Sequence, residues 1–311
     1  MNIIYAQSQQ GNLARIDRLT GEFVRIQPQP APGDDIPRWN WDSPIWVSQH
    51  QPTRIYFASQ RLWRSDDRGD NWIAISGDLT RNENRMRLPV QGRQWSWDAG
   101  WDLLAMSQYN TITSIGESPL NESLLYVGTD DGVISVTENN GASWRRLESV
   151  RGVPDMTLVE DIITSNHSGD VAYAVFDNHK RGDHNPYVYR SSDRGRTWTS
   201  ISGNLPNNGS VHTIAEDHVD PNLLFAGTEF GLFYSQNGGR SWQQLKTNFP
   251  TIDVRDIEIQ QRENDLVVGT FGRGVYVLDD YSALRTSAST VAANEATLFE
   301  VRDPWMYIEG D

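Results

Sequence analysis

Apolar and polar residues alternate along this chain in short runs that are broken by Gly, Pro, Asn and Asp. Residues 111–115 and 211–215 are typical, and each is followed by a more apolar run, at 124–128 and 223–227. Alternation over such lengths, bounded by turn residues, predicts β-strands rather than helices. No apolar run approaches the ~20 residues that span a bilayer, so we expect an all-β protein with no membrane-spanning helix.

Four segments share a motif of a hydroxyl residue, Asp or Asn two positions on, then Gly, and finally Trp. The Asp or Asn side chain can accept hydrogen bonds from nearby backbone N–H groups, and glycine takes a positive φ without strain. The motif therefore predicts a hairpin turn whose Trp packs toward the neighbouring sheet. We assign these residues a structural role: Ser65, Asp67, Gly69 and Trp72; Thr137, Asn139, Gly141 and Trp144; Ser191, Asp193, Gly195 and Trp198; Ser235, Asn237, Gly239 and Trp242.

Each motif lies inside a larger unit of four predicted strands, A to D, in which it joins strand C to strand D. The motifs begin at residues 65, 137, 191 and 235. The shortest interval matches the ~40–50 residues of a propeller blade. The pattern therefore predicts a β-propeller of four-stranded antiparallel blades, about six or seven in number.

We expect the propeller to occupy residues 1–281 and residues 282–311 to form a linker. The first hairpin has no A strand ahead of it, and open sheet edges promote aggregation. Residues 282–311 or an upstream part of a longer protein would have to supply that strand, and we favour the upstream source. The expected blades are 1–28, 43–76, 109–148, 155–202, 210–246 and 252–280; the first and last lack the motif.

The chain resembles the bacterial BNR/Asp-box repeat proteins of the sortilin-like, YVTN-type group that are often named glycosyl hydrolases. Besides the four motifs, the resemblance rests on residues 38–45, 128–132, 177–179 and 272–280 and extends over nearly the whole chain. It implies the second propeller of a longer protein, whose partners are an upstream propeller and, beyond residues 298–303, a downstream β-domain. It also implies an extracellular or periplasmic location, although residues 1–6 show no signal peptide.

Charge and cysteine content narrow the possible partners. The formal net charge of −14 argues against nucleic acid and anionic membranes as ligands. The chain has no cysteine, which excludes disulfides and thiolate metal sites. We expect no cofactor.

The long connections at 25–42, 77–110 and 177–186 are predicted to share the face opposite the four motifs, around the mouth of the central channel. Long ordered loops gathered on one face are where binding usually occurs. Trp95, Trp97 and Trp101 would either stack on a sugar ring or pack their own loop onto the propeller, and we slightly favour packing.

His179 is a second candidate for ligand binding, and the loop around it offers His179, Asp183 and His184 in metal-ligand numbers. We favour a hydrogen-bonded polar loop and no metal. Arg273 would bind an anionic group or pair with Asp130, Asp131 or Glu229, and we favour the ion pair.

A glycosidase on this fold needs two carboxylates at a defined separation. The candidates are Asp98, Asp102, Asp130, Asp131 and Glu229, and their spacing selects no pair. We therefore favour a non-catalytic propeller that binds a peptide, protein or glycan at the mouth. A glycoside hydrolase and a purely architectural domain are the alternatives.

Overall fold

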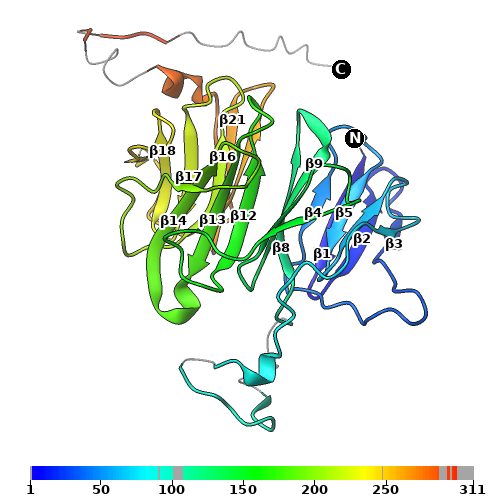
Figure 1. Cartoon of the computed structure of the whole chain (residues 1–311). Coiled ribbons are helices and arrows are strands. Elements are labelled where there is room, and N and C mark those ends of the chain that lie inside the picture. Colours follow the sequence, from blue (N-terminus) through cyan, green and yellow to red (C-terminus); the bar gives the residue numbers. More distant parts are fainter. Residues whose placement is uncertain are drawn as a thin grey trace.

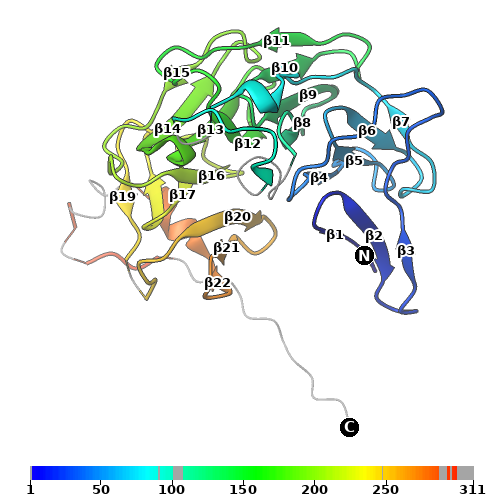
Figure 2. The ribbon, with the colours of Figure 1, turned by 90° about the horizontal axis from the view of Figure 1, so that it is seen from below.

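The computed structural model describes residues 2–89, 92–100, 108–246, 248–286, 293–294 and 296–299. In that part of the chain, six antiparallel sheets stand around a common axis (Figure 2). The protein is an all-β, six-bladed propeller, as predicted, and the blades are numbered here in chain order. No helix within the described ranges is long and apolar enough to cross a membrane.

Blades 2 to 5 each have four strands, of which the first lies nearest the axis and the last at the rim (Figure 2). Blade 2 contains β4 (Ile45–Val47), β5 (Ile55–Ala58), β6 (Leu62–Ser65) and β7 (Ile73–Ala74), and blade 3 contains β8 (Ile112–Ser118), β9 (Asn121–Thr129), β10 (Ile134–Thr137) and β11 (Arg145–Leu147). Blade 4 contains β12 (Leu158–Thr164), β13 (Ala172–Asn178), β14 (Asp183–Ser191) and β15 (Thr199–Ser200), and blade 5 contains β16 (Val211–Glu216), β17 (Leu224–Thr228), β18 (Gly231–Ser235) and β19 (Gln243–Gln244).

The two terminal blades have three strands each among the described residues. Blade 1 consists of β1 (Ile3–Ser8), β2 (Asn12–Asp17) and β3 (Phe23–Arg25), without an inner strand, as the sequence predicted. Blade 6 consists of β20 (Val254–Gln260), β21 (Asp265–Thr270) and β22 (Val275–Leu278), without a rim strand. The 3₁₀ helices are η1 (Arg85–Arg87), η2 (His179–Arg181) and η3 (Tyr281–Arg285).

Helix η3 fastens the start of the predicted linker to blade 5. Tyr281 OH donates to Asp217 Oδ1 at 2.5 Å. Arg285 donates to both carboxylate oxygens of Asp217, at 2.9 Å and 2.8 Å. Residues 281–285 therefore belong structurally to the propeller.

The hairpin motifs form the turns predicted from their sequence. In the first, Ser65 Oγ accepts from Gly69 N at 2.7 Å, and Asp67 Oδ1 accepts from Asn71 N at 2.8 Å. The same pair of contacts recurs in the other three motifs. Hydrogen bonds from Asn71 lower the pKa of the Asp67 carboxyl to about 2.

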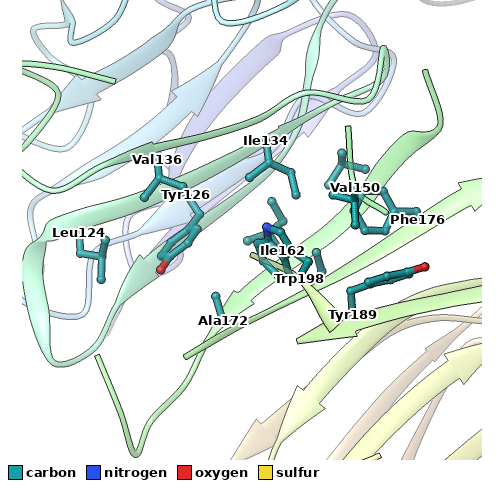
Figure 3. Packing of buried hydrophobic residues seen from close by; sticks show 12 residues of the cluster. Leu124, Tyr126, Ile134, Val136, Val150, Ile162, Ala172, Phe176, Tyr189 and Trp198 are labelled. Carbon is teal, nitrogen blue, oxygen red and sulfur yellow. The ribbon is translucent and has the colours of Figure 1, made fainter. Parts of the chain in front are cut away.

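The motif tryptophans join each blade to the one before it. Trp72, Trp144 and Trp242 each donate Nε1–H to a backbone carbonyl of the preceding blade, at 2.7, 3.0 and 2.9 Å. Trp198 is buried between blades 3 and 4, in the cluster with Tyr126 and Phe176 that Figure 3 shows. Its Nε1 has no hydrogen-bond partner within the described ranges.

This difference predicts that a Trp→Phe substitution lowers the free energy of unfolding by unequal amounts at positions 198 and 242. Trp242→Phe removes an indole and its hydrogen bond, whereas Trp198→Phe removes an indole whose N–H is already unsatisfied. Because a buried hydrogen bond contributes about 1 kcal/mol, Trp242→Phe is expected to lower the free energy of unfolding by about 1 kcal/mol more than Trp198→Phe. Urea denaturation of the two variants measures this difference, and equal losses would contradict it.

Candidate functional site

The three long connections lie on one face of the propeller, the lower face in Figure 1. The connection after β7 leaves this face as a cyan arm, and the green loop between β13 and β14 lies on the same side (Figure 1). The four hairpin motifs join third strands to fourth strands, so they lie at the opposite ends of the blades. The mouth is therefore the face on which a ligand can meet several connections at once.

A cavity of about 780 Å³ opens between two of these connections. One wall comes from the connection after β3, and the other comes from both ends of the connection that follows β7. Its lining combines charges of both signs, amides, one aromatic ring and one aliphatic side chain: Asp34, Asp35, Ile36, Arg38, Asn82, Glu83, Arg85, Gln108, Tyr109 and Asn110.

Arg38 and Asn110 hold the cavity walls together. Arg38 donates from Nε to the Asn110 carbonyl at 3.0 Å and from Nη2 to Asp78 Oδ2 at 2.6 Å. The Asn110 amide exchanges two hydrogen bonds with the backbone of Glu83, both at 2.8 Å. These bonds join segments far apart in sequence, so the cavity is preformed, as small-ligand sites usually are.

Asp130 is bonded to Thr111, the residue after Asn110 of the cavity lining, and its charge acts on Arg85 and Tyr109. Burial raises the pKa of the Asp130 carboxyl to about 7, against the hydrogen bonds from Thr111 N and Oγ1 at 2.8 Å and 2.7 Å. Burial also raises the pKa of Tyr109, helped by the charge of Asp130, and lowers the pKa of Arg85. Groups with shifted pKa values beside a cavity are typical of functional sites.

Asp131 fixes the connection after β7 to blade 3. Its Oδ2 accepts from Arg81 N at 2.7 Å, and its Oδ1 accepts from Thr129 Oγ1 at 2.5 Å. Arg81 then reaches Asp155 at 2.7 Å, which carries the contact to the next connection. The carboxylate of Asp131 therefore acts as a structural anchor, and both of its oxygens are engaged.

The loop between β13 and β14 places two imidazoles near one another. His179 is hydrogen-bonded through Nδ1 to Asp177 Oδ2. His184 Nδ1 lies 3.6 Å from Glu229 Oε2 on blade 5. Asp183 instead accepts hydrogen bonds within its own loop, from Asn178, Asn185 and Tyr187.

The inner strands of blades 3 to 6 each carry a β-bulge at the equivalent position near the mouth. Bulges redirect side chains and are common next to active sites. The bulged residue of blade 5, His212, is buried between Glu160 of blade 4 and Asp253 of blade 6, at 3.7 Å and 3.3 Å. Ionisable side chains of three neighbouring blades thus meet just inside the mouth.

Trp95 and Trp97, two of the three tryptophans predicted to bind a ligand, are not among the residues that line the cavity. Trp97 is 81% exposed on the arm, so it does not pack the loop onto the propeller. The Arg93 guanidinium lies 4.5 Å from the centre of the Trp95 ring. Trp101 and Asp102 lie outside the described residues.

Arg273 does not form the ion pair that we favoured from the sequence. It is exposed, between two glycines with positive φ, and no carboxylate of the described residues lies within 4.0 Å of it. The expectation of pairing with Asp130, Asp131 or Glu229 overlooked that the three carboxylates have nearer partners.

The residues that build the cavity were missed from the sequence. In the sequence, Arg38 belongs to the segment 38–45 that carries the family resemblance, and no motif distinguishes Arg85 or Tyr109. The available signal was that both 25–42 and 77–110 are long and rich in Asp, Asn and Arg. Their meeting across the mouth could not be read from either segment alone.

Comparison with family models identifies the BNR-Asp box repeat at residues 62–75 and 188–201. No curated protein matches the chain. Among solved structures, the GH74 xyloglucanase from Xanthomonas campestris aligns with a TM-score of 0.61 and 18% identity, over 92% of this chain and 44% of the enzyme. An ancestral GH74 enzyme is covered over only 30% of its length, so this chain spans less than half of either enzyme.

Two other neighbours are named for other roles. The extracellular domain of a hybrid two-component system protein from Bacteroides thetaiotaomicron aligns with a TM-score of 0.58 and 14% identity, over 89% of this chain and 32% of that one. YCF48 bound to D1 peptide aligns with a TM-score of 0.53 and 13% identity, over 85% of this chain and 70% of YCF48. At these identities the likeness concerns the fold. Together with the matched repeats, it identifies the chain as a six-bladed β-propeller built with BNR-Asp box repeats.

Proposed function

We propose that this chain is a non-catalytic binding propeller that takes a segment of a peptide, protein or glycan in the cavity at its mouth. The observation that carries the proposal is the preformed cavity of about 780 Å³ between the connections after β3 and β7. Arg38 and Asn110 hold its walls before any ligand arrives, which reduces the ordering cost of binding.

The lining suits a chain ligand rich in hydrogen-bonding groups. Arginine, carboxylate and amide side chains offer donors and acceptors side by side, as peptide groups and sugar hydroxyls require. Tyr109 and Ile36 add apolar surface, and Ile36 is 83% exposed before a ligand covers it. A few polar groups on a partly apolar wall are the usual composition of a ligand site.

The engagement of the candidate carboxylates favours binding over glycoside hydrolysis. Both oxygens of Asp130 and of Asp131 accept hydrogen bonds from neighbouring backbone or hydroxyl groups. A glycosidase needs one carboxyl group free to donate a proton and a second to act as base or nucleophile. Asp98 is bonded to Ser96 on the exposed arm, and Glu229 lies beside His184 on blade 5.

The neighbours support both arms of the proposal without choosing between them. YCF48 is named with a bound peptide, which is consistent with a peptide ligand at a propeller of this kind. The GH74 neighbours are consistent with a glycan ligand, and also with the alternative of a glycoside hydrolase. We further propose, from the family resemblance, that the propeller works within a larger exported protein beside another propeller and a β-domain.

Screening the chain against peptide and glycan arrays, together with an assay of reducing-sugar release, tests the proposal. Arg85→Gln and Tyr109→Ala are expected to weaken binding at least about tenfold, because each removes a group of the cavity lining. Arg240→Gln, in the hairpin turn of the opposite face, should bind as the unmodified chain does.

Two outcomes would replace this function by another. Release of reducing sugar that is lost in Glu229→Ala or Asp98→Ala would make the chain a glycoside hydrolase. A folded chain that neither binds on the arrays nor releases sugar would favour the architectural role.

A further inference from the structure

The loop between β13 and β14 brings two imidazoles to the mouth at the junction of blades 4 and 5. His179 comes from η2, and His184 is the second residue of strand β14. Their ring centres lie 6.4 Å apart and their planes differ by 32°. Both rings are partly open to solvent, with side chains 37% and 46% exposed.

Each of these rings has a carboxylate at the same atom, Nδ1. Asp177, whose side chain is 1% exposed, is hydrogen-bonded to the Nδ1 of His179 and also accepts from His179 N at 2.9 Å. Glu229 approaches the Nδ1 of His184 to 3.6 Å from the neighbouring blade. A carboxylate at Nδ1 favours the tautomer that carries its proton there and leaves the lone pair of Nε2 free.

The hydrogen bond between Asp177 and His179 is of the kind that surrounds metal-bound histidines in proteins. A ligating imidazole almost always donates its other N–H to a carboxylate, a carbonyl or water, which orients the ring and makes it more basic. Here the His179 ring has that support from Asp177 of its own blade, whereas Glu229 of blade 5 lies 3.6 Å from His184 Nδ1, close enough to bond only after the half-exposed His184 side chain moves. Within the described ranges, neither Nε2 atom forms a hydrogen bond that would compete for its lone pair.

We propose that His179 and His184 bind one divalent transition-metal ion, such as Zn²⁺, through their Nε2 atoms. Imidazole is a favoured ligand of Zn, Cu and Ni. With Zn–N bonds of about 2.0–2.1 Å and tetrahedral angles, two ligating rings have their centres about 5 Å apart. The rings must therefore approach by roughly 1 Å, and the half-exposed His184 side chain has room to move.

Within the described ranges the protein supplies these two ligands, and the remaining positions on the ion are left to other donors. Asp183 is occupied by hydrogen bonds from Asn178, Asn185 and Tyr187, which removes it from the ligand set considered from the sequence. No group of three or more His, Cys, Asp and Glu side chains within the described ranges is arranged for a metal. Water or a donor atom of a molecule at the mouth would complete the coordination, as in zinc sites that keep an open position.

Calorimetric titration of the chelator-treated chain with ZnCl₂ at pH 7.5, without any other ligand, tests this proposal. One ion is expected to bind per chain, and His179→Asn and His184→Asn should each weaken binding at least tenfold. Asp177→Asn should weaken it about 10- to 100-fold, although it leaves both imidazoles in place, because it removes the group that orients His179. Circular dichroism shows whether each variant is folded.

Lys180→Gln is the matched control, since it changes the same loop and removes a positive charge without touching either ring. Its affinity for Zn²⁺ should equal or exceed that of the unmodified chain. Absence of Zn²⁺ binding, or equal binding by the unmodified chain and the folded histidine variants, would overturn the proposal. Because no ligand of the cavity takes part, either result is independent of the peptide or glycan assays.

Discussion

Glu216→Ala is expected to lower the free energy of unfolding by about 3–5 kcal/mol, because three buried donors lose their acceptor and the truncated side chain leaves a cavity. Glu216 ends the inner strand of blade 5, is 4% exposed, and points into blade 4. Three donors of blade 4 bind its carboxylate: Ser165 Oγ at 3.0 Å, Asn166 N at 2.8 Å and Tyr173 OH at 2.8 Å.

The expected loss is large because the partners stay buried when the carboxylate is removed. Ser165 and Tyr173 would each keep a polar hydrogen with no acceptor, at a cost of about 1–3 kcal/mol per group. The truncated side chain also leaves a cavity between two blades. Glu216→Gln keeps one acceptor oxygen and the volume, so its loss should be smaller than that of Glu216→Ala.

The same arrangement recurs between blades 2 and 3, which provides an internal replicate. Glu117 accepts from Ser48 Oγ at 2.9 Å, from Gln49 N at 3.0 Å and from Tyr56 OH at 3.1 Å. The two sites share no partner, so the losses of Glu117→Ala and Glu216→Ala should add in the double variant.

Glu122→Ala is the control for these variants, because Glu122 is exposed and its contact with Arg54 is a long ion pair at 3.5 Å. Its effect should stay within about 0.5 kcal/mol. Guanidinium denaturation with slopes compared between variants gives the losses. A Glu216→Ala loss no larger than that of Glu122→Ala would show that this network contributes little to holding the blades together.

The strands and turns could be predicted from the sequence because their determinants are local. In the hairpin motif, Ser65, Asp67 and Gly69 bond to one another or to the next few backbone groups. Nothing outside the turn is needed to specify it. The tryptophan at the end of the motif donates its N–H to a carbonyl of the preceding blade, and a repeat protein provides a preceding blade at each of these positions.

The site depends instead on contacts between distant segments, and these could not be predicted. Arg38 and Asn110 are separated by 72 positions and meet only because blades 1 to 3 curve around the mouth. The role of Glu216 likewise requires the register between two blades, although Ser165 and Ser48 occupy matching repeats. The proposed site depends on which residues of different blades come into contact. A single sequence shows that the blades repeat, but it does not show these contacts between them.

Asp161→Asn is expected to make the protein more stable than the unmodified chain at pH 8 and about equally stable at pH 4, where folded Asp161 is protonated and therefore also uncharged. Asp161 lies on the inner strand of blade 4, and its Oδ2 accepts from Thr213 Oγ1 at 3.0 Å and Ile214 N at 3.2 Å. Burial raises the pKa of its carboxyl from 3.8 to about 7, against these bonds and with help from the charges of Asp256 and Glu160.

The direction follows from the protons bound in each state. Between pH 4 and pH 7 the folded chain keeps the proton of Asp161 while the unfolded chain has lost it, so stability falls as pH rises through this interval. A shift of about three pKa units corresponds to at most about 4 kcal/mol, and partial exposure of the residue reduces this to about 2 kcal/mol. Asparagine carries no charge at any pH and keeps an acceptor oxygen for both donors, so it avoids the loss.

Asp193→Asn is the matched control, because hydrogen bonds from Thr197 lower the pKa of the Asp193 carboxyl to about 2 despite some burial. The contribution of the Asp193 carboxylate to stability is lost only as pH falls through the range from about 4 to 2. Between pH 5 and pH 8 the unfolding free energy of Asp193→Asn should therefore change with pH as that of the unmodified chain does. Only the unfolding free energy of Asp161→Asn should rise above that of the unmodified chain. Unfolding free energies at several pH values distinguish the two cases, and parallel curves for Asp161→Asn would mean that Asp161 is ionised in the folded propeller throughout this range.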